Sequence, residues 1–110
     1  MAIQETGDLV TIRLCATHDI PAGEVIRVDL DDGRALAVYN LDGEFFATDD
    51  LCTHGDASLA EGEVDGGKIL CPFHMGSFDI RTGEAIGAPC SIAVRTYCVS
   101  VSGDDVVIDA

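Results

Sequence analysis

Short stretches of alternating apolar and polar residues recur along the chain. Apolar residues share one parity in four such stretches: Val10, Ile12 and Leu14; Ile26, Val28 and Leu30; Ala93, Tyr97, Val99 and Val101; and Val106 and Ile108. Successive side chains of a β-strand point to opposite faces of its sheet, so a period of two predicts a strand with one buried face. No stretch keeps a helical period, and the best helix candidate, residues 56–60, is one turn at most.

Turn-forming dipeptides separate the apolar stretches. They are Asp32-Gly33, Asp42-Gly43, Asp65-Gly66 and Ser102-Gly103. Many short strands joined by glycine-containing turns predict an all-β fold, an antiparallel sandwich or barrel. The 110 residues show no linker and no internal repeat, so we expect a single domain over residues 1–110.

One region departs from this strand rhythm. From about residue 49 to residue 89 the chain is rich in Gly, Cys, His and Pro. We interpret it as a loop-rich subdomain, spanning about residues 45–89, that is inserted into the sheet framework. Loops held by a rigid scaffold are where binding residues concentrate.

Two short motifs in this region carry candidate metal ligands. Cys52-Thr53-His54 is a Cys-x-His motif, Cys71-Pro72-Phe73-His74 is a Cys-x-x-His motif, and sixteen residues separate them. Each offers one thiolate and one imidazole, which are ligands for a borderline or soft metal. The same four side chains suit a tetrahedral zinc ion or a [2Fe–2S] cluster with two Cys on one iron and two His on the other. The ligand types alone leave both open.

The residues around the motifs favour the iron–sulfur cluster. Gly55, Pro72 and Gly76 flank the ligands, as expected for loops whose backbone N–H groups approach bridging sulfides closely. The apolar side chains of Phe73, Met75 and Phe78 would limit the access of water and help to set the redox potential.

This run of residues resembles the Rieske ferredoxin family. It is similar above all to the ferredoxin components of bacterial aromatic-ring-hydroxylating dioxygenase systems. The matching segments are Cys-Thr-His-Gly at 52–55, Cys-Pro-Phe-His-Met-Gly-Ser-Phe-Asp at 71–79, Thr82-Gly83-Glu84 and Ala88-Pro89.

The resemblance implies a Rieske fold and one Rieske-type [2Fe–2S] cluster per chain. Cys52 and Cys71 would bind one iron, and His54 and His74 would bind the other at an exposed tip where electrons enter and leave. The chain would be an electron carrier, not an enzyme. Its partners would be an NAD(P)H-dependent flavoprotein reductase and a terminal aromatic-ring-hydroxylating oxygenase.

Departures from the Rieske proteins of respiratory bc-type complexes predict a low redox potential. Those proteins have an extra cysteine in each ligand loop, which this chain lacks, and a Ser and a Tyr where this chain has Gly76 and Phe78. Fewer hydroxyl hydrogen bonds to the cluster stabilise its reduced form less. We therefore expect a midpoint potential of about −150 mV, at the low end of the Rieske range. A voltammetric midpoint above zero would contradict this expectation.

The charge balance restricts the kinds of partner. Six Lys and Arg oppose 20 Asp and Glu, a net charge of −14. Such a field repels nucleic acid and anionic membranes and attracts basic protein surfaces. No stretch has the length and composition of a signal peptide or a membrane span, so we expect a cytoplasmic protein. In that reducing compartment its five cysteines would be thiols or metal ligands.

The remaining candidates have ordinary interpretations. We expect Cys15 and Cys98 to be core or surface thiols and His18 to be solvated, while Cys90 follows a loop that approaches the cluster in the family. The acidic pairs Asp31-Asp32, Asp49-Asp50 and Asp104-Asp105 are interpreted as turn residues and solvated charge.

Three other functions stay open. They are the Rieske domain of an oxygenase large subunit, which needs a second, larger domain; the Rieske-like small subunit of a nitrite reductase; and a zinc-binding interaction module. The visible absorption of the purified protein separates the zinc module from the others.

Overall fold

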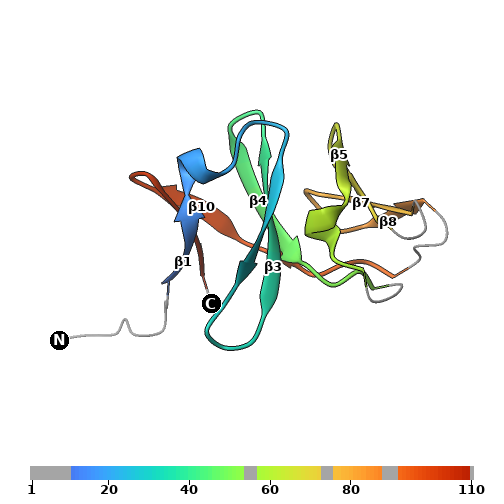
Figure 1. The fold of residues 1–110 in the computed structure, drawn as a ribbon, viewed down its shortest axis with the longest axis horizontal. Helices are drawn as coiled ribbons and strands as arrows, with labels where there is room; N and C mark the ends of the chain where they lie inside the picture. Colours follow the sequence, from blue (N-terminus) through green and yellow to red (C-terminus); the bar gives the residue numbers. More distant parts are fainter. Residues whose placement is uncertain (1–10, 54–56, 73–75, 88–91, 110) are drawn as a thin grey trace.

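A computed structural model describes residues 11–53, 57–72, 76–87 and 92–109. Three antiparallel sheets follow one another along the molecule (Figure 1), which confirms the predicted all-β class. The strands are β1 (Thr11–Ala16), β2 (Val25–Asp29), β3 (Ala35–Leu41), β4 (Glu44–Asp49), β5 (Glu63–Asp65), β6 (Lys68–Leu70), β7 (Ser77–Asp79), β8 (Ala85–Gly87), β9 (Thr96–Tyr97), β10 (Val99–Ser102) and β11 (Asp105–Asp109). Two 3-10 turns, η2 (Thr17–Asp19) and η3 (Leu59–Glu61), complete the described elements.

The first two sheets form the body of the molecule. Their strand orders are β1-β11-β10 and β2-β3-β4-β9. The buried side chains between them form one apolar core, whose members are Leu14, Cys15, Ile20, Leu36, Val38, Ala47, Val106 and Ile108. The predicted alternation is confirmed in β2, where Ile26 and Val28 are half-buried and Arg27 and Asp29 are exposed.

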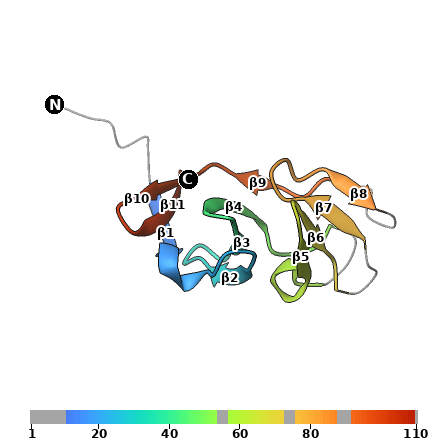
Figure 2. The ribbon, with the colours of Figure 1, turned by 90° about the horizontal axis from the view of Figure 1, so that it is seen from above.

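The third sheet, β5-β6-β7-β8, lies on the side of the second sheet that faces away from the first sheet (Figure 2). It occupies much of the region for which the sequence predicted loops. Its strands have only three residues each, too short for an alternation to stand out among the glycines. This sheet and β3 enclose a second apolar core, which we call the distal core: Ala37, Tyr39, Leu41, Cys52, Ala57, Leu59, Ile69, Cys71, Phe78, Ile80 and Val94.

Strand β3 contributes to both cores. Leu36 and Val38 enter the core of the body, whereas Ala37, Tyr39 and Leu41 enter the distal core. A strand that is buried on both faces is apolar along most of its length, and β3 has Asn40 as its one polar side chain. A search for alternation therefore passes over it, and this strand was not among those predicted from the sequence.

The predicted turns are confirmed, whereas the C-terminal alternation is only partly correct. Gly33, Gly43, Gly66 and Gly103 all have positive φ angles and join consecutive strands. The stretch 93–101 is not one strand with one buried face. Strand β9 pairs with β4 in the second sheet and β10 pairs with β11 in the first, and Val101 is exposed. None of the helical turns in the described segments is long and apolar enough to cross a membrane.

Candidate functional site

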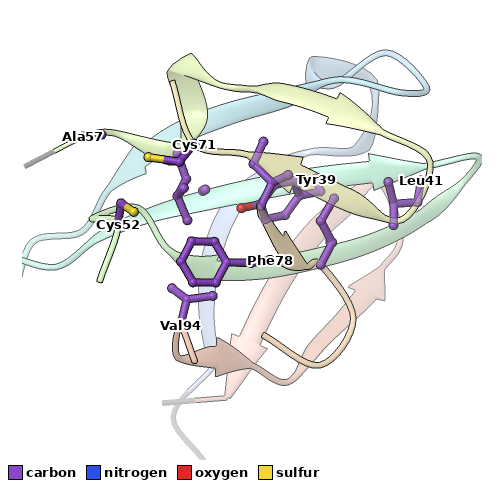
Figure 3. Packing of buried hydrophobic residues seen from close by; sticks show 11 residues of the cluster. Tyr39, Leu41, Cys52, Ala57, Cys71, Phe78 and Val94 are labelled. Atoms are coloured by element: carbon purple, nitrogen blue, oxygen red, sulfur yellow. The ribbon is translucent and has the colours of Figure 1, made fainter. Parts of the chain in front are cut away.

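Two of the four predicted ligands, Cys52 and Cys71, lie together in the distal core (Figure 3). Their side chains are almost completely buried, at 2% and 1% exposure. They come from segments nineteen positions apart in the sequence that the fold brings to one end of the core. The other two predicted ligands, His54 and His74, lie outside the described residues, as do Gly55, Phe73, Met75 and Cys90.

Each cysteine begins a short loop of the same length. The Cys52 N–H donates a hydrogen bond of 2.9 Å to the carbonyl of Ala57, and the Cys71 N–H donates one of 2.7 Å to the carbonyl of Gly76. Both bonds join residue i to residue i+5, so each closes a six-residue loop that contains the neighbouring histidine of its motif. We call residues 52–57 the first loop and residues 71–76 the second loop.

The second loop is the end of a regular hairpin. Strands β6 and β7 pair in register, with Leu70 opposite Ser77 and Ile69 opposite Phe78. The ring of Phe78 is fully buried and lies among Cys52, Cys71 and Val94 in the distal core (Figure 3). This aromatic side chain keeps water from the inner side of the two thiols.

The first loop has a different base. It follows β4, and beyond an isolated bridge between Leu51 and Ser58 its returning chain enters η3 instead of a second strand. Asp50 lies at this base with 3% exposure. Its Oδ1 accepts hydrogen bonds from the Ser58 hydroxyl and the Ala60 N–H, each 2.9 Å long. The interpretation of Asp49-Asp50 as solvated charge is therefore wrong, because folding buries Asp50 where local donors satisfy it.

The preceding residue, Asp49, is also engaged. The Tyr97 hydroxyl donates a 2.5 Å hydrogen bond to its Oδ1, and the Asp49 N–H donates to the carbonyl of Arg95. Burial, aided by this carboxylate, raises the pKa of Tyr97 above its ordinary value. The guanidinium carbons of Arg34 and Arg95 lie 5.5 and 5.3 Å from the centre of the tyrosine ring. These contacts fasten the end of β4, from which the first loop starts.

A third segment, residues 92–94, packs against both the first loop and the third sheet. The Thr53 hydroxyl donates a 2.7 Å hydrogen bond to the carbonyl of Ile92, and the Val94 N–H donates a 2.8 Å bond to the carbonyl of Gly83. Gly83 has a φ of +79°, and a Cβ there would lie 2.2 Å from the carbonyl oxygen of Val94. Only glycine permits this close approach.

The segments that contain the two motifs and the neighbouring residues 85–94 carry little charge in the sequence, and some of their described side chains are exposed and apolar. Residues 51–60, 71–78 and 85–94 contain one residue among Lys, Arg, Asp and Glu, which is Asp56, although the whole chain has 26. Within the described part of the chain, Leu51, Ile86 and Ile92 are three of the four large apolar side chains that are exposed, at 59%, 51% and 65%. We call these three residues the apolar rim.

The donor set agrees with a thiolate-bound metal group. Cys52 and Cys71 could supply two soft sulfur ligands from the first positions of two equal loops, and both are buried in the distal core. The two other described cysteines and the third histidine are elsewhere: Cys15 is buried in the core of the body, Cys98 is exposed and His18 is exposed in η2. These three residues are placed as the sequence predicted.

Two residues that support the site were not predicted from the sequence. Asp50 and Thr53 hold the first loop, but Asp50 lies outside the ligand pattern and Thr53 is the variable middle position of the Cys-x-His motif. The adjacency of Asp50 to the Cys-x-His motif was the available signal, but an acidic pair is also typical of a solvated turn.

Comparisons with known proteins agree with this geometry. A family model described as the Rieske [2Fe–2S] domain matches residues 10–98. The ferredoxin component of the p-cumate 2,3-dioxygenase system of Pseudomonas putida is 50% identical over 109 residues, covering 97% of this chain and 92% of that protein.

Solved structures give the same result. The ferredoxin of Sphingomonas yanoikuyae B1 matches with a TM-score of 0.88 and 50% identity, over 92% of this chain and 99% of that one. A chain in a complex of reduced oxygenase and oxidised ferredoxin of carbazole 1,9a-dioxygenase matches with a TM-score of 0.86 and 39% identity, over 91% of this chain and 93% of that chain. Two chains described as nitrite reductase small subunits, at 20% and 22% identity, share the fold alone.

Proposed function

Because this chain belongs to the Rieske [2Fe–2S] family, we propose that it carries single electrons from an NAD(P)H-dependent flavoprotein reductase to a terminal aromatic-ring-hydroxylating oxygenase. The observation that carries the proposal is the pair of buried thiols, Cys52 and Cys71, at the start of two matching loops beside an apolar rim. The 50% identity to a dioxygenase ferredoxin component supports the choice of partners. We place this exchange in the cytoplasm, where reduced cysteines persist.

The residues of the chain have separate tasks in this function. Cys52 and Cys71 would hold one iron of the cluster, and His54 and His74 would hold the other. The bound cluster supplies a reversible one-electron couple. Phe78 and Val94 exclude water from the inner side of the two sulfur ligands, which helps to set the redox potential. These tasks involve no bond making on a substrate.

The apolar rim would form the centre of the docking surface. Leu51 is adjacent to Cys52, and Ile92 is joined to the first loop through Thr53, so both lie next to the proposed ligands. An uncharged centre can be desolvated at low cost when a partner covers it. The numerous carboxylates elsewhere would guide a partner with a basic surface toward this centre.

The proposal is tested by reconstituted turnover. The purified chain is combined with NADH, a flavoprotein ferredoxin reductase and, in turn, the terminal oxygenases of the p-cumate, naphthalene, biphenyl and carbazole systems. We expect oxidised product that depends on the chain with at least one of these oxygenases. In each system, the ferredoxin that belongs to the oxygenase serves as the positive control. The proposal is wrong if the reduced chain transfers no electrons to any of the oxygenases that these control ferredoxins reduce.

The rate of transfer should depend on salt. With a net charge of −14, we expect the second-order rate of oxygenase reduction to fall about tenfold or more between about 20 and 500 mM salt, because ions screen the attraction between exposed charges. Stopped-flow absorption of the reduced chain measures this rate. A rate that does not change across this range would show that the carboxylates do not steer docking.

A further inference from the structure

The buried carboxylate of Asp50 is the strongest feature that the proposed electron transfer does not use. It is 3% exposed and two residues before the proposed ligand Cys52. Removing a carboxylate from water is costly unless hydrogen bonds and an opposite charge compensate it. Its surroundings should therefore show why the chain keeps a charge at this place.

The first group of contacts to the Asp50 carboxylate comes from the residues that follow the first loop. Asp50 Oδ1 accepts hydrogen bonds from the Ser58 hydroxyl and the Ala60 N–H. The backbone of Asp50 makes two more bonds, since its N–H donates to the carbonyl of Ala35 and its carbonyl accepts from the Leu59 N–H at 2.7 Å. One residue thus joins β3, the start of the first loop and the start of η3.

The second loop needs no such residue. Paired strands β6 and β7 support it on both sides, down to the pair of Lys68 and Asp79. The first loop has the Leu51–Ser58 bridge and then a 3-10 turn, so side-chain bonds from Asp50 continue the support where strand pairing ends. The position of Cys52 therefore depends on Asp50 more than that of Cys71 depends on any one side chain.

The second contact to the Asp50 carboxylate is an ion pair with one guanidinium group. Arg27 Nη1 on β2 lies 3.7 Å from Asp50 Oδ2, while its Nε donates to Asp29 at 3.0 Å. The Arg27 side chain is about half exposed, whereas the Asp50 side chain is at 4%. The negative charge is thus inside the protein and its partial compensation is at the surface, where water screens it more.

Asp50 is also close to the proposed ligand Cys52 along the chain. Two Cα atoms that are two residues apart are at most about 7 Å apart, so a fixed charge on Asp50 lies near the loop that would hold the cluster. Adding an electron near a fixed negative charge is unfavourable, and a neighbouring positive charge has the opposite effect. Both groups therefore act on the redox potential with opposite signs.

We propose that Asp50 is a positioning residue of the iron–sulfur centre, which holds the first loop through Oδ1 and, together with Arg27, sets the midpoint potential. The carboxylate favours the oxidised form and Arg27 moderates this effect. The inference rests on the proposed function in taking Cys52 as a cluster ligand.

The charge is tested with two variants of the cluster-loaded protein. Asp50→Asn keeps an Oδ1 acceptor and removes the charge, and Arg27→Gln removes the compensating charge. We expect the midpoint potential, measured by voltammetry, to rise in Asp50→Asn and to fall in Arg27→Gln, with iron content unchanged. The matched control is the ion pair of Arg13 and Asp105, 2.8 Å apart on β1 and β11, two strands at the opposite end of the molecule from the third sheet (Figure 2). Arg13→Gln and Asp105→Asn should leave the potential where it is.

The positioning role is tested separately by hydrogen exchange. We expect the Ala60 amide to exchange at least tenfold faster in Asp50→Ala, which lacks its acceptor, and at the wild-type rate in Asp50→Asn. Potentials that shift in the same direction in Asp50→Asn and Arg27→Gln, or do not shift, overturn the electrostatic role. Unchanged Ala60 exchange in Asp50→Ala overturns the positioning role. If the proposed function were wrong instead, the wild-type protein would lack the [2Fe–2S] spectrum.

Discussion

Replacing Cys71 with alanine is expected to give a colourless protein without iron or acid-labile sulfide. The thiol of Cys71 is 1% exposed at the start of the second loop, and no other cysteine of the described residues except Cys52 shares the distal core. Among the described residues, no further sulfur is therefore placed to replace it as a ligand. Iron and sulfide analysis, visible absorption and the EPR signal of the reduced protein measure the effect.

Two other cysteines provide the controls. Cys15 is buried in the core of the body and Cys98 is exposed between β9 and β10. Cys15→Ala tests the loss of a buried thiol and Cys98→Ala the loss of a surface thiol, and both should keep two irons per chain. If Cys71→Ala kept its colour and iron, the ligand assignment would be wrong. Stoichiometric zinc in the colourless wild-type protein would restore the zinc interpretation.

Replacing Phe78 with alanine is expected to lower the free energy of unfolding by about 3–5 kcal/mol. The ring is fully buried in the distal core, and its strand β7 is paired on both sides, with β6 and β8. Truncation removes apolar contacts and leaves a cavity that short paired strands cannot easily close. Because small domains are stable by only about 5–15 kcal/mol, this is a large part of the total. Urea unfolding followed by far-UV circular dichroism measures it.

Ile86 in the neighbouring strand β8 is the matched control. Its side chain is 51% exposed, so Ile86→Ala should change the free energy of unfolding by less than about 1 kcal/mol. Equal losses in Phe78→Ala and Ile86→Ala would mean that the distal core contributes less to stability than its burial indicates. A large loss in Phe78→Ala alone supports the packing described here.

The sequence predicted the fold class and the metal-binding chemistry of the site better than it predicted the residues that hold the two loops in place. Turns such as Asp42-Gly43 and strands such as β2 depend on local residue types, which a sequence displays directly. The two Cys–His motifs are also local, and the structure brings Cys52 and Cys71 together as the metal hypothesis requires. The positions of His54 and His74 as ligands stay predictions.

The parts that were not predicted depend on contacts between distant segments. Strand β3 shows no alternation because different cores cover its two faces. Asp50 is indistinguishable from a solvated aspartate until Ser58 and Ala60 return to it, and Gly83 shows no need for glycine until Val94 packs against it. Such requirements exist only in the folded chain.

The double role of β3 also constrains how such a protein can diverge. A substitution at Leu36 or Val38 alters the packing of the core of the body. Because Ala37 and Tyr39 share the same backbone, a shift of β3 also changes the packing of the distal core. Neither half can be repacked over many generations without compensation in the other. An exchange of the cluster-bearing half between relatives is therefore expected to succeed only when β3 is inherited with it.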